Sequence, residues 1–349
     1  MMLTTKLLNL GLDSFFQQQL PLDDVSAFMP VRIMNVHRSG LQVAGDDIDR
    51  HVELSGSEYE LNLTVGDWAL LDSNTHRLVR RLDRKSLFKR RAPGANRREQ
   101  MIAANVDTLF IVSSCNKDFN EARLERYLAI AREARVMTII ILTKADLVDD
   151  SRDYLQRAGK LAPGVQVEAV NALRGDELDC LDPWLKSGQT IALLGSSGVG
   201  KSTLTNTLLG LQGISTQAIR EDDAKGRHTT TSRSMHLIPG GAWLLDTPGM
   251  RELQLTDVKT GLDDVFAEIS ALANTCRFTD CDHVDEPGCR VNSAIEAGEI
   301  DQSRLDRWRK LAREEAHNRT SIAERRANDK ALGRMYKNII SDKKSRRNT

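Results

Sequence analysis

The sequence predicts a multidomain α/β protein with a small N-terminal β-barrel, a parallel α/β domain and a C-terminal helical module that binds a metal. Three patterns carry this prediction. Short alternating segments lie between residues 29 and 85, continuous apolar segments and amphipathic ones alternate from residue 105, and a Cys/His cluster precedes charged helical sequence after residue 259. At 349 residues the chain is long enough for two or three domains, each with its own core.

The first part of the chain divides into a lead-in and a barrel. We expect residues 1–28 to be a weakly structured lead-in and residues 29–90 to form a five-stranded barrel of the oligonucleotide-binding (OB) type. The segments "VRIMNVHR", "LQVAG", "HVELSG", "VGDWALLD" and "HRLVRRL" alternate between apolar and polar residues and are separated by turn residues. This pattern is typical of short strands in a small barrel rather than of helices.

The second part, residues 91–258, predicts a parallel sheet covered by helices. The segments "DTLFIVSS", "MTIIILTK", "VQVEAV" and "TIALLG" are continuously apolar, which indicates strands buried on both faces. "MHLIPGGAWLLDTPG" adds a hairpin around residues 239–241. Residues 259–349 are expected to form a zinc-binding module and basic C-terminal helices.

A phosphate-binding loop follows one of these strands. Residues 195–202 satisfy G-x-x-x-x-G-K-[ST] between a strand and a helix, which is the context that the motif requires. Backbone N–H groups would surround the phosphates, Lys201 would neutralise them, and the Ser202 hydroxyl would bind Mg²⁺. The expected nucleotide contacts here are Gly195, Ser196, Ser197, Gly198, Val199, Gly200, Lys201, Ser202 and Thr203.

Two further segments complete the expected phosphate site. "LLDTPG" ends a strand in D-x-x-G, so Asp246 would hold the water shell of Mg²⁺ and the Gly249 N–H would face the γ-phosphate. The polar segment "KGRHTTTSRS" would act as a switch in which a threonine reaches Mg²⁺ while the γ-phosphate is present. Thr230 is our first choice and Thr229 the next; a plain surface loop is the alternative.

A guanine-reading corner is expected at "TIIILTKADL". Asp146, after a strand, would accept the guanine N1–H and 2-amino group, and the stem of Lys144 would cover the base. Thr143 stands where Asn is usual. The strand ending in "AVNALRG" would supply a second base loop, with a backbone N–H near Ala172 touching O6 and Asn171 replacing the usual Ser.

The order of these parts is reversed relative to ordinary small GTPases, in which the base-reading elements come last. Moving three strands to the front preserves a parallel sheet if the original termini were close together. The permuted order, the preceding barrel and the following cysteine cluster resemble the RsgA (YjeQ/EngC) family of circularly permuted GTPases, over residues 30–310. The resemblance implies GTP hydrolysis with Mg²⁺, and binding to the small ribosomal subunit late in its maturation.

The residue that orients the attacking water is not evident. Many GTPases carry Gln directly after D-x-x-G, but this chain has Met250, which cannot orient water. His228 is the best internal candidate, and the family carries a His at the matching position; the alternative is a solvent-facing loop histidine. We therefore expect His228, Lys201 and Thr230 to contribute to hydrolysis.

A zinc site is expected in "CRFTDCDHVDEPGC". Cys276, Cys281, His283 and Cys289 follow the spacing C-x4-C-x-H-x5-C, which also matches the family. Three thiolates and one imidazole suit a closed tetrahedral site with a structural role. The alternative is a coincidental group of buried cysteines.

Charge is distributed unevenly although the formal net charge is zero. Residues 304–349 hold 15 Lys and Arg against 6 Asp and Glu, and residues 84–98 contain seven cations and no acid. This segregation favours an RNA or another polyanion as partner, with solvated surface as the alternative. We expect a cytoplasmic protein, because no apolar run is long enough for a membrane span and no secretory pattern is evident. We also expect a monomer.

The sequence therefore predicts a GTPase that binds the small ribosomal subunit and its rRNA, with GTP or GDP, Mg²⁺ and one structural Zn²⁺. Three alternatives remain open at this stage. The nucleotide site could serve mainly as a binding switch with little turnover, it could be vestigial in an RNA-binding protein, or the chain could be a metabolic or DNA-linked nucleoside triphosphatase.

Overall fold

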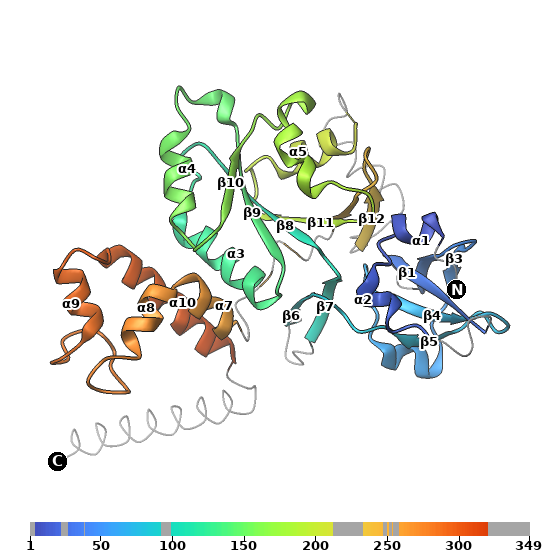
Figure 1. The fold of residues 1–349 in the computed structure, drawn as a ribbon, viewed down its shortest axis with the longest axis horizontal. Coiled ribbons are helices and arrows are strands. Elements are labelled where there is room, and N and C mark those ends of the chain that lie inside the picture. Colours follow the sequence, from blue (N-terminus) through green and yellow to red (C-terminus); the bar gives the residue numbers. More distant parts are fainter. Residues whose placement is uncertain are drawn as a thin grey trace, which may run out of the picture.

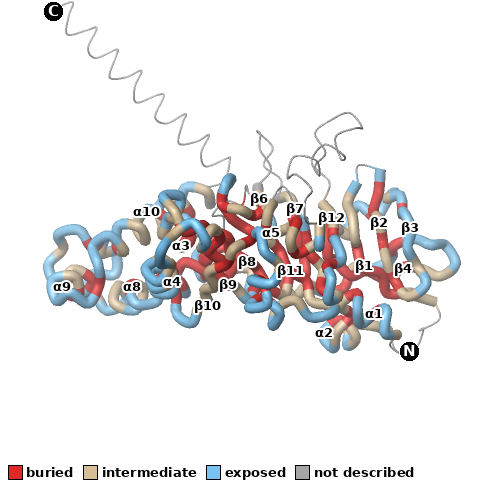
Figure 2. Tube along the Cα trace, turned by 90° about the horizontal axis from the view of Figure 1, so that it is seen from above, coloured by how far each residue is buried: buried red, intermediate tan, exposed pale blue. Residues whose placement is uncertain are grey.

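The computed structural model describes residues 4–21, 27–37, 39–91, 99–211, 233–246, 250, 253 and 258–319. The molecule has three parts in a row: N-terminal strands at one end, a central sheet with its helices, and a helical module at the other end (Figure 1). Buried residues concentrate in the central strands (Figure 2). None of the helices in the described residues has an apolar stretch long enough to cross a membrane.

Five antiparallel strands form the N-terminal part: β1 (Phe28–Val36), β2 (Leu41–Ala44), β3 (Asp49–Val52), β4 (Trp68–Asp72) and β5 (Leu78–Arg81). They pair in the order β3-β2-β1-β4-β5 around a core that includes Val31, Ile33 and Val43. Trp68 packs inward, as the sequence predicts. Among the described strands β3 and β5 share no ladder, so the structure contains the five strands but does not confirm a closed OB barrel.

The lead-in is better structured than the sequence predicts. Residues 5–17 contain two short helices, α1 (Thr5–Asn9) and α2 (Ser14–Gln17). Four apolar side chains of this segment are buried against Trp68, Leu70 and Leu82; they are Leu7, Leu10, Leu12 and Phe16. The expectation of a weakly structured segment is therefore wrong for these residues, because tertiary packing stabilises helices that are too short to be stable alone.

Arg32 joins the lead-in, the N-terminal strands and the central sheet. Its buried guanidinium donates to the Leu10 carbonyl and, at 2.6 Å, to the Thr190 hydroxyl, and lies 5.8 Å from the centre of the Trp68 ring. Burial lowers the pKa of Arg32 to about 10, so the group stays charged at neutral pH. One side chain of β1 thus links α1 to the first residue of a central strand.

A separate hairpin connects the two parts. It consists of β6 (Leu87–Arg91) and β7 (Glu99–Ala104), paired antiparallel. The expected boundary between residues 90 and 91 falls inside this hairpin.

The central sheet has the predicted parallel core. The strands β8 (Thr108–Ser114), β9 (Met137–Thr143), β10 (Gln166–Ala169), β11 (Thr190–Gly195) and β13 (Trp243–Asp246) run parallel in the order β10-β9-β8-β11-β13. The strand β12 (Arg233–Leu237) forms the expected hairpin with β13. Beyond β13, β12 also pairs with β1, through Asn35 opposite Ser234 and Val36 opposite Arg233, so the N-terminal strands continue the central sheet.

Helices cover both faces of this sheet, as continuous apolar strands require. On one face Leu109 and Ile111 pack with α3 (Glu121–Glu133) and α4 (Arg152–Gly159). On the other face Phe110 and Val112 pack with α5 (Lys201–Leu208).

The C-terminal module consists of helices and connecting loops in its described part. It contains α7 (Lys259–Val265), α8 (Ala267–Ala273), α9 (Arg290–Glu296) and α10 (Gln302–Arg319). The module docks on α3, where the buried carboxylate of Glu125 binds Arg304 at 2.8 Å and Arg307 at 2.8 Å. Both arginines lie on α10.

Helix α7 approaches α3 closely at Gly261. A Cβ atom at this position would lie 2.0 Å from the Ala129 carbonyl oxygen, and the Gly261 N–H donates to Glu133 at 3.0 Å. Only a residue without a side chain allows this approach of the two helices.

Gly261→Ala is expected to lower the free energy of unfolding by about 1–3 kcal/mol, because the added methyl group pushes α7 away from α3. The clash outweighs the usual gain of about 1 kcal/mol when Ala replaces Gly in a helix. Thermal and denaturant unfolding would measure the change. Gly159→Ala is the matched control, because nothing lies within 4 Å of an added Cβ at the end of α4. A Gly261→Ala protein as stable as the parent would contradict this account of the docking.

Candidate active site and metal centre

The predicted nucleotide-binding segments meet at one edge of the central sheet. β8, β9, β11 and β13 are parallel neighbours, so their carboxyl ends lie together. In these ladders Thr143 stands opposite Ser114, and Gly195 opposite Val112. Asp246 follows Leu245, which stands opposite Ala192. The reversed chain order therefore leaves the parts of one site side by side.

The phosphate loop has the backbone that its motif requires. Gly198 and Gly200 adopt φ values of 84° and 90°, which favour glycine. Helix α5 begins at Lys201, and its N-cap residue Gly200 offers no side chain to its first N–H groups, which are therefore left to bind an anion. The Lys201 side chain is buried and its amine donates to the Ser196 carbonyl within the loop.

The base-reading corner lies directly against this loop. Lys144 adopts φ 58° immediately after β9, and its amine donates to the Gly198 carbonyl at 2.8 Å. Asp146 follows in the short 3-10 turn Ala145–Leu147 and is exposed, so its carboxylate is accessible to a ligand. Because the Lys144–Gly198 contact joins the base-reading corner to the phosphate loop, a single nucleotide could reach both.

Thr143 has a structural contact that the sequence did not predict. It is fully buried, and its hydroxyl lies 2.5 Å from the Val199 carbonyl and 3.1 Å from the Ser113 carbonyl. A Cβ on Gly200 would lie 2.9 Å from the same hydroxyl. Thr143 thus ties the base-reading strand to the phosphate loop, a function that needs only one hydroxyl donor.

The second base loop follows β10. Asn171 accepts the N–H of Leu173 at 3.0 Å, which gives the loop a tight turn, and Ala172 is buried. The Ala172 carbonyl accepts the Thr207 hydroxyl at 2.6 Å. Sequence reasoning missed Thr207, because nothing in a helical Thr indicates which distant carbonyl it meets.

Several expected site residues lie outside the described part of the chain: His228, Thr229, Thr230 and Gly249. Their roles therefore stay predictions. Asp246 is described and exposed at the end of β13, and Ser202 is half-buried in the first turn of α5. Met250 is buried, so the residue after D-x-x-G packs into the core.

These residues fit a magnesium–nucleotide complex. The uncapped start of α5 and the Lys201 amine match phosphate oxygens in charge and hydrogen-bonding type. The Ser202 hydroxyl and the Asp246 carboxylate are the oxygen ligands that Mg²⁺ prefers.

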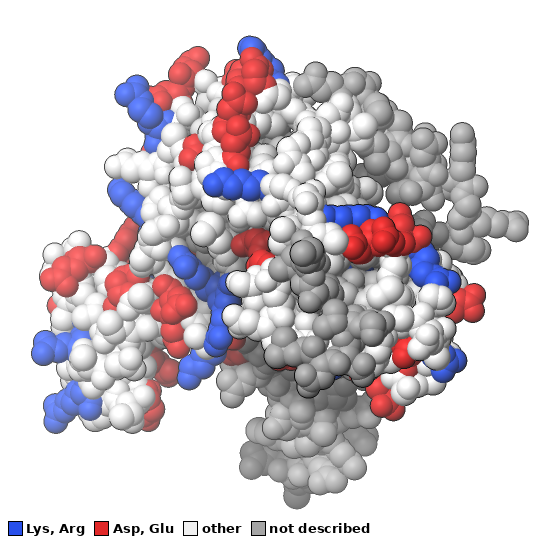
Figure 3. All heavy atoms as spheres, turned by 45° about the vertical axis from the view of Figure 1, so that its right-hand side comes forward, with Lys and Arg blue, Asp and Glu red and all other residues white. Residues whose placement is uncertain are grey.

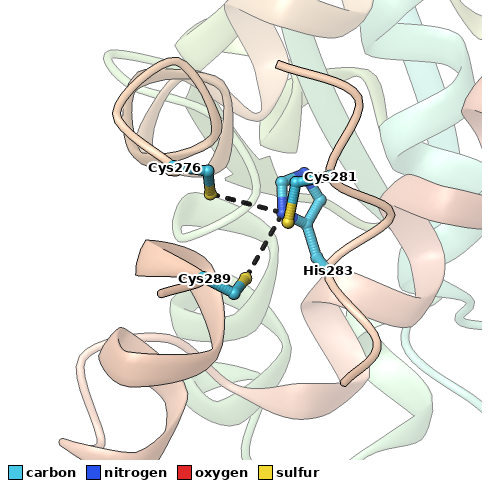
Figure 4. Close-up of side chains that lie close together, drawn as sticks. All are labelled: Cys276, Cys281, His283 and Cys289. Carbon is cyan, nitrogen blue, oxygen red and sulfur yellow. Dashed lines mark hydrogen bonds between the residues drawn. The ribbon is translucent and has the colours of Figure 1, made fainter. Parts of the chain in front are cut away.

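The four predicted zinc ligands converge in the helical module (Figure 4). The ligand atoms of Cys276, Cys281, His283 and Cys289 all lie within 4.8 Å of one another. The His283 Nδ1 atom is 3.6 Å from the Cys276 sulfur and 3.5 Å from the Cys289 sulfur. In a tetrahedral site, ligand atoms bound to zinc at about 2.0–2.3 Å are ~3.3–3.8 Å apart, so the most distant pair of this cluster would move together by about 1 Å on metal binding.

The surroundings of this cluster favour metal binding. The backbone N–H groups of Arg290 and Asn292 donate to the sulfurs of Cys276 and Cys289, both at 3.4 Å, which stabilises thiolates. Burial and the nearby Arg309 guanidinium lower the pKa of His283, which keeps the imidazole in its neutral, metal-binding form.

Helix α10 holds the metal-binding loop in place. Arg309 donates to the carbonyls of Asp282 and His283, and the Trp308 ring lies 5.6 Å from the His283 ring. Since α10 also binds α3 through Arg304 and Arg307, one helix joins the metal centre to the central domain.

A phosphate loop that follows the base-reading corner in the chain, on one parallel sheet, defines a circularly permuted GTPase. The RsgA GTPase family model matches residues 81–256. A relative from Vibrio parahaemolyticus, named small ribosomal subunit biogenesis GTPase RsgA 2, is 50% identical over 97% of this chain and 93% of its own length. A relative from Mesorhizobium japonicum with the name RsgA is 50% identical over 89% of this chain and 90% of its own length. The chain therefore belongs to the RsgA GTPase family and is a GTP hydrolase.

Solved structures show the same fold. YjeQ from Thermotoga maritima aligns with a TM-score of 0.59 at 24% identity, covering 81% of this chain and 97% of that one. YloQ, described as a circularly permuted GTPase, aligns with a TM-score of 0.57 at 21% identity, covering 86% of this chain and 100% of that one.

Removal of one zinc ligand is expected to abolish metal binding and to unfold the loop between α8 and α9. Metal analysis of the purified protein should find one zinc ion per chain, and Cys289→Ser should lose it together with thermal stability, because metal binding supplies folding energy there. Cys180→Ser is the control, since Cys180 is exposed and lies outside the cluster. Equal zinc content in both variants would contradict the assignment.

Proposed function

We propose that this GTPase acts on the small ribosomal subunit late in its maturation, as a cytoplasmic monomer that binds the subunit with GTP and leaves after hydrolysis to GDP and phosphate. The observation that carries the proposal is the 50% identity, over nearly the whole chain, to a relative named for small-subunit biogenesis. The match extends well beyond the GTPase domain, so it supports a common partner as well as a common reaction.

The nucleotide would be held by the residues that converge at the sheet edge. Asp146 would read the guanine N1–H and 2-amino group, Lys144 would cover the base, and Lys201 with the loop N–H groups would bind the phosphates. Ser202, Asp246 and Thr230 would hold Mg²⁺, which when bound supplies charge neutralisation at the β- and γ-phosphates. Thr229, the Gly249 N–H and the remaining loop residues would complete the contacts.

Binding to rRNA would use basic segments of the chain. Part of the 84–98 run is already engaged within the protein: Arg84 pairs with Asp67 at 2.7 Å, and Lys85 pairs with Asp13. Charged side chains of both signs are interspersed on the face shown in Figure 3. Arg90 also donates to the Gln100 side chain at 3.0 Å. We assign the phosphate contacts to the basic run 84–98 and the C-terminal cations together, with an affinity that falls steeply as salt is raised.

The zinc module would couple docking to hydrolysis. Helix α10 contacts both the metal loop and α3, and α3 follows β8 of the nucleotide-binding sheet. Docking of the module on rRNA would therefore act on the central domain through α3, in addition to the chain that leaves β13.

The first test measures binding and hydrolysis with purified small subunits. The protein should co-sediment with subunits in the presence of a non-hydrolysable GTP analogue, much less with GDP, and subunits should accelerate its GTP hydrolysis. Cys281→Ser should lower the stimulated rate far more than the basal rate, with Cys180→Ser as control. Equal losses of both rates would argue against coupling, and co-sedimentation that ignores the nucleotide would argue against the proposed function.

The second test concerns His228, which we propose orients or deprotonates the attacking water because Met250 is buried and cannot do so. His228→Ala should lower subunit-stimulated turnover by about 100-fold, the lower end of the range for general acid–base catalysis. GDP affinity, measured in parallel, should stay at the parent value. Unchanged stimulated turnover would remove His228 from the mechanism.

A further inference from the structure

We propose that Thr207 is a positioning residue for guanine recognition, because its hydroxyl holds the Ala172 carbonyl so that the Ala172 N–H faces the base. This inference rests on the proposed function, in which the loop after β10 touches guanine O6. The residue lies near the end of α5, 35 positions along the chain from Ala172. Neither the phosphate-loop motif nor the base-reading motifs include it.

The hydrogen bond from Thr207 is well placed for this role. Its hydroxyl lies 2.6 Å from the Ala172 carbonyl and 3.1 Å from the Thr203 carbonyl of its own helix. A hydroxyl has a single proton to donate, so the shorter contact takes the hydrogen bond. The bond therefore serves the base loop rather than the helix.

The peptide group between Ala172 and Leu173 is fixed at both ends. Thr207 binds its carbonyl, and the Asn171 side chain accepts its N–H at 3.0 Å. The chain is also fixed two residues before Ala172, because the Val170 N–H donates to the Leu142 carbonyl at 2.9 Å. These bonds leave the Ala172 backbone little freedom to rotate.

The Ala172 N–H is the donor that we assign to the base. Ala172 is only 5% exposed, and its N–H makes no hydrogen bond within the described residues. Buried backbone donors in proteins nearly always have a partner. A guanine O6 in the adjacent base site would be such a partner.

Thr207 also places the base site relative to the phosphate site. The N-terminus of α5 belongs to the phosphate loop, and Thr207 near its other end holds the base loop. A single rigid helix thus sets the distance between the two ends of the nucleotide. The base loop after β10 and the phosphate loop after β11 are thus held at a fixed separation by contacts of the same helix.

The test compares three nucleotides on the full-length protein, by competition with a fluorescent GDP analogue. 6-Thio-GDP replaces only O6 by sulfur, a weaker acceptor, whereas IDP lacks only the 2-amino group that Asp146 would read. Thr207→Val should weaken GDP binding about threefold to tenfold, the size of one neutral hydrogen bond. The preference for GDP over 6-thio-GDP should shrink toward one, and the preference for GDP over IDP should stay at its parent value.

Two further variants distinguish a positioning role of the Thr207 hydroxyl from a general loss of structure in α5. Thr207→Ser keeps the hydroxyl and should restore the parent preference for GDP over 6-thio-GDP. Thr205→Val makes the same chemical change elsewhere on α5 and should leave both preferences intact. The inference is overturned if Thr207→Val leaves the GDP to 6-thio-GDP ratio unchanged, or lowers both ratios together. A parent protein without preference for guanine nucleotides would instead refute the proposed function, which distinguishes the two failures.

Discussion

Two hydrogen bonds from the end of β9 to the phosphate loop hold the nucleotide site together. The Thr143 hydroxyl binds the Val199 carbonyl at 2.5 Å, and the Lys144 amine binds the Gly198 carbonyl at 2.8 Å. Because 56 positions separate Thr143 from Val199 along the chain, no short connection fixes the position of β9 relative to the phosphate loop. The sheet brings the two segments to the same edge, and these bonds hold them in direct contact.

The C-terminal module is fixed to the same domain by a different kind of contact. Glu125 is buried between two arginines of α10, and Gly261 lets α7 lie directly on the backbone of α3. Breaking a buried ion pair of this kind is costly, because the remaining charge stays without its partner. The candidate metal centre is therefore connected to the central domain by packed helices.

The sequence predicted the features that depend on local pattern. Continuous apolar segments identified the parallel strands, glycine and lysine spacing identified the phosphate loop, and the spacing of Cys276 to Cys289 identified the metal cluster. These signals are strong because each one is a property of neighbouring residues. The order of these motifs along the chain in turn indicated the resemblance to a permuted family.

Other features depend on distant partners and were missed or left open. The helices of residues 5–17 exist because Leu7 and Phe16 pack against Trp68, a contact across some fifty residues that propensity does not encode. The closure of the N-terminal strands was expected from their number, but strand number alone does not decide which edges pair. Thr143 and Thr207 were missed as structural ties, because a hydroxyl has no pattern that reveals which carbonyl it will meet.

The pairing of β1 with β12 has a consequence for shortened versions of the protein. Asn35 and Val36 pair with Ser234 and Arg233, so one sheet continues from the N-terminal strands into residues 81–256, which the family model matches. A shortened chain that begins after the first five strands would leave β12 with a bare edge of backbone donors and acceptors, which is a template for self-association. The N-terminal strands therefore protect the edge of the nucleotide-binding sheet, because β1 pairs with the strand β12 that would otherwise be exposed.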